Sequence, residues 1–202
     1  MAKQGLVIGG STISARQMKD FFRQADEGSI TGSMFQDFLD HKGQSSKTNI
    51  YLKRIFAEEK IYIGATDGYA SLANAINIFS SINFDFRELG LHNMCLPTNG
   101  RVAVEIFELV KEGTFEKIYG SFGKNRDRFC LTQSQIVRFC VEHTDFLKSD
   151  GTRNFFLFED DNRFFVADVC RFNDKWHIDV LKLLNSNVWC VEGKPRFFFP
   201  QL

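Results

Sequence analysis

Three cations at alternate positions precede the strongest helix signal of the chain. The cations lie in "GKNRDRF", and the helix that follows, "LTQSQIVRFCVEH", carries further polar residues. Lys and Arg side chains contact phosphates, and polar residues of a helix that enters a groove can contact bases. A predicted β-hairpin comes next, which is the order of elements in a winged helix. The candidate nucleic-acid site consists of Lys124, Arg126, Arg128, Gln133, Gln135 and Arg138.

The charge balance of the whole chain argues against this site. Lys and Arg together number 25, as do Asp and Glu, so the formal net charge is zero. A chain without a net positive field has little to attract a phosphate backbone or an anionic membrane. The predicted hairpin also leads into further strands instead of ending as a wing. Nucleic-acid binding is therefore the alternative hypothesis, and no membrane partner is expected.

Residue types that catalyse reactions occur without the partners that catalysis needs. His92 lies three residues before Cys95 in "LHNMC", but no orienting group or oxyanion donor is evident nearby, so a buried thiol is the favoured interpretation. The acidic residues at 159–161 are typical of a hairpin turn. The five Cys form no CxxC pair and no zinc-type Cys/His run. We therefore assign no catalytic residue, metal or cofactor, and an enzyme is not favoured.

Capping residues and helical periodicity predict helices at several places in the chain. Thr132 and Gln135 form a capping box for "LTQSQIVRFCVEH", with Leu131 and Ile136 as a hydrophobic staple. His143, at the end of this helix, is expected to be a packed or C-capping imidazole. Helices are also predicted for residues 14–41, as a pair, and for "YASLANAINIF", "RVAVEIFELVKEG" and "TFEKIYGSFG".

The chain becomes β-prone after Gly151. Aromatic and β-branched runs alternate with turn residues at spacings suited to hairpins, which predicts an antiparallel meander of four or five strands. In one run Trp176, Ile178 and Val180 share a face that should be buried. The first two runs are apolar on both faces, so we expect a helix on one side and a further cover, from the chain or a partner, on the other. The runs are residues 155–158, 164–172, 176–183, 188–191 and 196–199.

These signals predict an α+β fold. A small N-terminal helical segment, residues 1–45, precedes an α+β domain, residues 46–202, in which helices pack on the C-terminal antiparallel sheet. The polar stretch "HKGQSSKTN" is expected to be the linker or an exposed loop. "NIYLKRIF" and "KIYIGA" after it are short β-prone segments.

Several motifs occur together at the two ends of the chain. They are "LTQSQIVRFCVEH", "FLKSDGTRNFFLF", "RFFVADV", "VWC" and "FFFPQL" in the C-terminal half, with "TISARQMKDFF" and "GSITGSMFQDFLDH" at the N-terminus. As a set they resemble a group of uncharacterised proteins from environmental bacteria of the candidate phyla. Residues 49–99 share little of this likeness. Because that group has no established activity, the resemblance implies no catalytic or binding residue.

The function that these observations favour is binding. The 23 Phe residues are expected mostly in the core, and the remainder can form an interface. We expect a non-enzymatic protein-binding or adaptor module that uses a Phe-rich sheet face or edge, with a protein partner or self-association through the sheet. We expect it in the cytoplasm, because the apolar run at residues 6–8 is far too short for a signal peptide.

Overall fold

The computed structural model describes residues 7–8, 11–12, 49–82, 89, 91, 97–123 and 125–201. The chain divides into two compact units, Met1–Thr48 and Asn49–Leu202. In the first unit β1 (Val7–Ile8) pairs with β2 (Ser11–Thr12) as an antiparallel ladder. The helical pair predicted for residues 14–41 lies outside the described residues.

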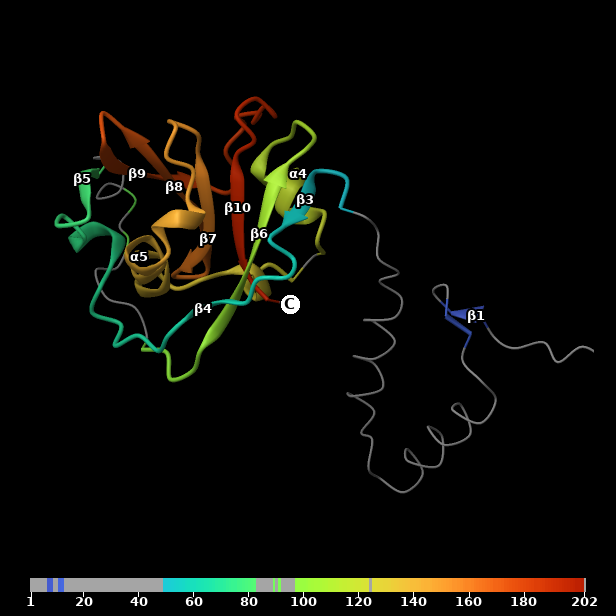
Figure 1. The fold of residues 1–202 in the computed structure, drawn as a ribbon, viewed down its shortest axis with the longest axis horizontal. Coiled ribbons are helices and arrows are strands. Elements are labelled where there is room, and N and C mark those ends of the chain that lie inside the picture. The colour runs from blue at the N-terminus through green and yellow to red at the C-terminus, as the bar shows by residue number, and fades with distance from the viewer. Residues whose placement is uncertain are drawn as a thin grey trace, which may run out of the picture. The chain divides into compact units, whose positions relative to one another are not determined.

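The described part of the second unit is built on one sheet of eight strands. Their order is β3-β6-β10-β7-β8-β9-β5, and β4 pairs with β6 beyond the end of β3. Figure 1 shows this order from β5 at the left to β3 at the right. The strands are β3 (Leu52–Ile55), β4 (Ile61–Ile63), β5 (Phe79–Ile82), β6 (Val102–Leu109), β7 (Asn154–Asp160), β8 (Arg163–Phe172), β9 (Lys175–Lys182) and β10 (Arg196–Pro200).

The sheet is mixed, which corrects the predicted meander of four or five strands. The last strand, β10, returns to the centre and lies between β6, to which it is antiparallel, and β7, to which it is parallel. A second parallel pair joins β5 to β9 at the edge. The central position of β10 follows from its three consecutive buried Phe residues, since only a strand covered on both faces can bury such a run.

Turn chemistry fixes the two hairpins of the sheet, as the sequence predicts. Asp161 and Asn162 connect β7 to β8, and Asn173 and Asp174 connect β8 to β9. All four residues have positive φ angles, between 49° and 59°. Two such residues in succession give a type I′ turn, whose twist matches that of paired strands, and Asn and Asp tolerate this conformation best.

Helix α5 (Gln133–Glu142) confirms the strongest helix prediction. The Thr132 side chain accepts a hydrogen bond from the backbone N–H of Gln135, and the Gln135 side chain accepts one from the N–H of Thr132. Helix α4 (Phe115–Gly120), capped by Thr114, confirms the one predicted in "TFEKIYGSFG". Three single turns of 3-10 helix complete the described elements: η1 (Leu72–Asn74), η2 (Asp127–Phe129) and η3 (Thr144–Phe146).

Two predicted helices and one predicted strand were wrong. "RVAVEIFELVKEG" forms the strand β6, whose apolar residues also fit a period of two: Val104 and Ile106 enter one core and Leu109 the other. "YASLANAINIF" contains only η1 and the start of β5. Residues 188–191 contribute a single β-bridge, between Trp189 and Gly113. For β6, pairing with β3 and β10 from distant parts of the chain decided the conformation and overrode local propensity.

Both faces of the sheet are core. Phe156 and Phe158 belong to the cluster under α5, whereas Phe155 and Leu157 belong to the cluster under α4. All four side chains are fully buried, and the ring of Phe156 stacks on that of Phe198, with 4.4 Å between centroids. The second cover of the Phe runs therefore comes from the chain itself, through α4, and no partner is needed to bury them.

The buried face of β9 agrees with its prediction. Ile178 and Val180 lie in the α5-side core and Trp176 packs against it, while Asp179 and His177 face the other side and are half-buried. None of the helices in the described ranges has the length and apolar character of a membrane span.

Candidate binding site

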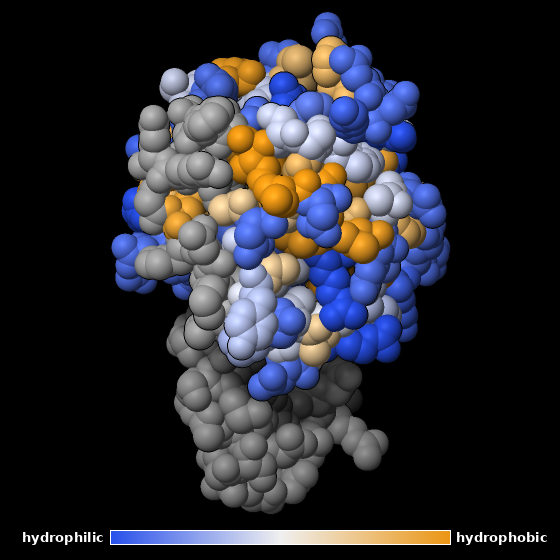
Figure 2. Space-filling view, turned by 90° about the vertical axis from the view of Figure 1, so that its left-hand side faces the viewer, coloured by the Kyte–Doolittle hydropathy of each residue, from blue (hydrophilic) through white to orange (hydrophobic). Residues whose placement is uncertain are grey.

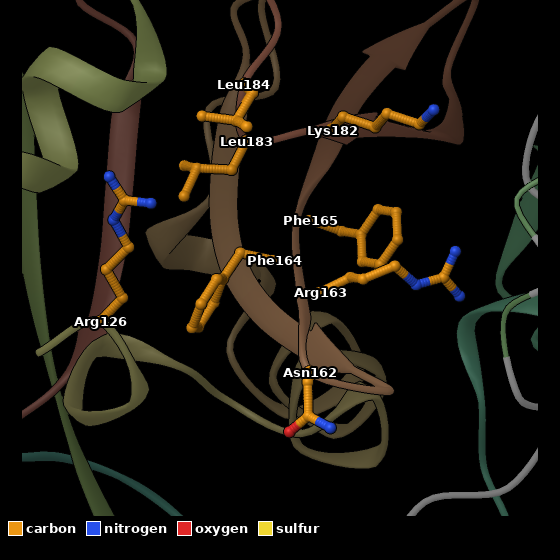
Figure 3. A pocket seen from close by; sticks show the side chains of 8 residues that line it. All are labelled: Arg126, Asn162, Arg163, Phe164, Phe165, Lys182, Leu183 and Leu184. Atoms are coloured by element: carbon orange, nitrogen blue, oxygen red, sulfur yellow. The ribbon is translucent and has the colours of Figure 1, made fainter.

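A hollow of about 360 Å³ lies where β8 begins and β9 ends; we call it the Arg126 pocket (Figure 3). Segments far apart in the sequence form it, namely the loop before η2, the β7–β8 turn and the residues that follow β9. Its lining residues are Arg126, Asn162, Arg163, Phe164, Phe165, Lys182, Leu183 and Leu184.

Strand alternation divides these residues between two sides. Phe165 belongs to the α5-side core and Lys182 lies opposite it in the β8–β9 register, so both side chains leave the pocket. Figure 3 shows Arg163 extending to that side as well. Phe164, by contrast, packs against the α4-side core. The pocket therefore has an apolar floor, formed by Phe164, Leu183 and Leu184, and Arg126 faces this floor.

Local structure holds the floor in place. The backbone N–H of Leu183 donates to the carbonyl of Phe164, which extends the β8–β9 ladder by one pair. The Leu183 side chain is buried in the α4-side core, whereas Leu184 is 71% exposed. A turn follows, in which the N–H of Asn185 donates to the carbonyl of Lys182. A leucine left so exposed beside a hollow is a surface that a partner could bury.

Arg126 is positioned by its backbone and leaves its guanidinium largely unused. Its carbonyl accepts hydrogen bonds from the N–H of Phe129 and from the Cys130 thiol. The guanidinium lies 3.7 Å from a carboxylate oxygen of Glu116, which is longer than a hydrogen bond. Arg carries five N–H donors, so in the described part of the chain Arg126 retains donors for an anion.

The other candidate nucleic-acid residues that the structure describes do not line the pocket with Arg126. Gln133 and Gln135 are buried: the Gln133 side chain accepts from the N–H of Leu72 and Gln135 completes the capping box. Arg138 pairs with Glu142 at 2.8 Å and donates to the carbonyl of Ala65. Arg128 is exposed, and Lys124 lies outside the described residues.

The hairpin after α5 is also not a wing, because β7 and β8 lie in the middle of the sheet. Two side chains proposed to face a groove thus serve the interior. The nucleic-acid interface stays a prediction that now depends on the exposed cations alone.

The remaining sequence candidates are the Cys and His residues. His92 and Cys95 lie outside the described residues. Burial, with Glu159 and Asp127 nearby, raises the pKa of the Cys130 thiol to about 12, and burial raises that of Cys140 further. Both thiols are therefore protonated at neutral pH and poor nucleophiles. Among the described residues no three His, Cys, Asp or Glu side chains form a group able to hold a metal ion.

A second, open hollow of about 410 Å³ lies beside the end of α5. The prediction for His143 is confirmed there: its backbone caps α5, and its ring packs on Phe139 with 5.1 Å between centroids. Its Nε2 is 2.9 Å from the carbonyl oxygen of Tyr62, so this nitrogen donates. The hollow mixes a carboxylate with cations and defines no single ligand; its lining is Glu59, Lys60, Ile61, Tyr62, Arg101, His143 and Phe146.

One buried carboxylate was not anticipated from the sequence. Asp168, on β8, is 2% exposed. One of its oxygens accepts from the Arg153 guanidinium at 3.1 Å, and the other has no hydrogen-bond partner among the described residues. Asp179 lies directly opposite in the β8–β9 register. Burial raises the pKa of Asp168 to about 7, Arg153 lowers it, and Asp179 raises it.

Sequence reasoning named Arg126 but missed the floor of its pocket. Phe164 and Leu183 have the types and spacing of core residues in a strand, and both contact the α4-side core. Only Leu184, an apolar residue directly before the turn "NSN", carried a signal, since it lies where a strand should already have ended.

Comparisons with protein-family models, with curated proteins and with solved structures each found no match for this chain. The resemblance to the candidate-phyla group therefore stays a prediction, and the function has to be inferred from the geometry of the described residues.

Proposed function

We propose that this protein is a non-enzymatic protein-binding module and that its binding surface is centred on the Arg126 pocket. The observation that carries the proposal is an exposed leucine, Leu184, beside an apolar hollow that faces a largely unused guanidinium. Arg together with large apolar side chains is typical of the residues that dominate protein interfaces. The site lies at strand ends, because core covers both faces of the sheet at the Phe-rich strands β7 and β10.

The connection between β9 and β10 carries further exposed apolar residues after Leu184. Val188 and Val191 in this connection are also exposed. A hollow of about 360 Å³ is at the small end of ligand pockets, so it suits one large side chain of a partner. Burying a leucine side chain that is now exposed contributes ~1.5–3 kcal/mol to association. The added apolar connection makes a protein surface a better fit than a small molecule.

A second exposed apolar residue, Ile76, provides the matched control. Figure 2 shows the side of the second unit that carries β5 and β9, where apolar residues gather among hydrophilic ones. Ile76, between η1 and β5, is 76% exposed, which is close to the exposure of Leu184. The two residues have similar chemistry and lie in different places, so they separate a specific interface from general stickiness.

The proposal is tested by placing a photo-crosslinking amino acid at position 184 or at position 76 of the full chain. We expect position 184 to crosslink to a defined protein in the native host, and Leu184→Asp to abolish its recovery while Ile76→Asp does not. The reverse result would move the interface to the surface around Ile76. Crosslinks from position 184 to nucleic acid or to a second copy of the chain would contradict the proposed partner class.

Variants of Arg128 and Arg126 distinguish nucleic-acid binding from protein binding. If the surface before α5 held phosphates, Arg128→Glu would weaken binding as much as Arg126→Glu does, and binding would weaken with rising salt. The pocket proposal expects Arg128→Glu to leave the partner's affinity unchanged, because Arg128 does not line the pocket.

A further inference from the structure

We infer that the Arg126 pocket recognises a polypeptide segment in which an apolar side chain stands next to a carboxylate, and that this carboxylate displaces Glu116 from Arg126. The inference rests on the proposed function and specifies its partner. Two observations carry it: the apolar floor and the long Arg126–Glu116 contact.

The resident ion pair is easily exchanged. The Arg126 and Glu116 side chains are 27% and 58% exposed, and their charged atoms are 3.7 Å apart. Exposed pairs at such distances contribute little, because water solvates both partners well. Glu116 can return to solvent when another carboxylate approaches, so the pair holds the guanidinium near the pocket without blocking it.

A carboxylate of the ligand interacts more strongly with Arg126 than Glu116 does. A ligand whose apolar side chain covers Leu184 and Phe164 excludes water from the guanidinium, and charge-assisted hydrogen bonds strengthen where water is excluded. The planar guanidinium can also donate two parallel hydrogen bonds to one carboxylate. The apolar floor therefore supplies affinity, and Arg126 supplies selectivity for an adjacent acid.

The surroundings favour a carboxylate over a phosphate. Glu116 faces Arg126, and Glu159 lies opposite Phe164 in the β7–β8 register and is exposed. Two carboxylates near a single guanidinium repel a dianion more than a monoanion. Arg163 and Lys182 line the hollow, but their side chains leave it (Figure 3). Of the lining residues that the structure describes, Arg126 is therefore the cation that serves the ligand. An acidic residue or a chain-terminal carboxylate meets these conditions.

The test selects ligands from a phage-displayed library of random peptides on the immobilised full chain. We expect the enriched peptides to carry Asp, Glu or the terminal carboxylate beside Leu, Ile, Phe or Trp. Each enriched peptide is then compared with its amide version, Asp→Asn or Glu→Gln, by fluorescence anisotropy. The acid form should bind wild type about tenfold more tightly, as expected for a charge-assisted bond.

Variants of the ion pair give opposite results if the inference is right. Arg126→Gln should weaken the acid peptide about tenfold and leave the amide peptide unchanged. Glu116→Gln should strengthen the acid peptide, because it removes the competing carboxylate. Arg126→Lys keeps the charge but loses the paired donors, so its affinity for the acid peptide should lie between those of wild type and Arg126→Gln. Circular dichroism establishes that each variant is folded before its affinity is used.

Failure of the inference is distinguishable from failure of the proposed function. If Leu184→Asp abolishes peptide binding but Arg126→Gln and Glu116→Gln change nothing, the module binds partners and the role of Arg126 is wrong. Enriched peptides that are basic, or equal affinities of acid and amide peptides, would overturn the inference in the same way. If no enriched peptide depends on Leu184, the proposed function itself is wrong.

Discussion

The buried carboxylate of Asp168 should make the stability of the protein depend strongly on pH. Burial is the main reason why its pKa is raised from 3.8 to about 7, with Arg153 lowering it and Asp179 raising it. Because the folded state binds this proton more tightly than the unfolded chain, the contribution of Asp168 to stability is greatest below about pH 4 and falls as the pH rises to about 7. Above about pH 8 this group adds no further change.

The magnitude follows from the same values. The interval from 3.8 to about 7 corresponds to ~4 kcal/mol of free energy of unfolding, at ~1.36 kcal/mol for each pH unit. Asp168→Asn keeps the shape and removes the charge, so it removes this dependence. We expect the free energy of unfolding of Asp168→Asn, relative to that of wild type, to increase by up to ~4 kcal/mol between about pH 4 and pH 8.

The assay is urea unfolding of both proteins at a series of pH values, followed by the fluorescence of Trp176 and Trp189. Asp174→Asn is the matched control, because the Asp174 side chain is 97% exposed and should leave the curve unchanged. Asp179→Asn should flatten the wild-type curve in part, since it removes a like charge opposite Asp168. A difference between Asp168→Asn and wild type that stays constant with pH would refute the reasoning.

Three further predictions concern the fold. Thr132→Ala removes the capping box and should lower the free energy of unfolding by ~1 kcal/mol in urea titrations. Phe156→Ala empties a fully buried site against Phe198 and should cost ~3–5 kcal/mol, seen as a large loss of melting temperature. Thiol labelling of the native protein should modify the exposed Cys190 quickly and spare Cys140 until unfolding, as mass spectrometry of the labelled peptides would establish.

Local signals predicted the parts of the fold that depend on neighbouring residues. The capping box at Thr132 and the Asp161–Asn162 turn are each complete within a few residues, so the sequence alone identifies α5 and the β7–β8 hairpin. The strand β6 could not be identified in this way. Its residues fit both periods, and the choice depends on β3 and β10, which pair with it from distant parts of the chain.

The candidate site was predictable only in part, for a similar reason. The sequence indicates Arg126 because it alternates with Lys124 and Arg128, a spacing that places side chains on one face only in a strand. Residues 127–129 form a 3-10 turn instead, so Arg126 is half-buried beside the pocket whereas Arg128 is exposed. The apolar floor comes from β8 and from the residue after β9, and no short-range pattern joins these to Arg126.

The lengths of α4 and β8 explain why the Arg126 pocket lies at the end of the sheet. Helix α4 has six residues and is about 9 Å long, whereas β8 has ten residues and is about 33 Å long. A helix this short covers the centre of its face, where Phe155 and Phe197 lie, and cannot reach the end of β8. There Leu184 is exposed and Phe164 is half-buried, and the Arg126 guanidinium lies beside them. The segment that we propose as the ligand, with an apolar side chain next to an acid, complements that composition.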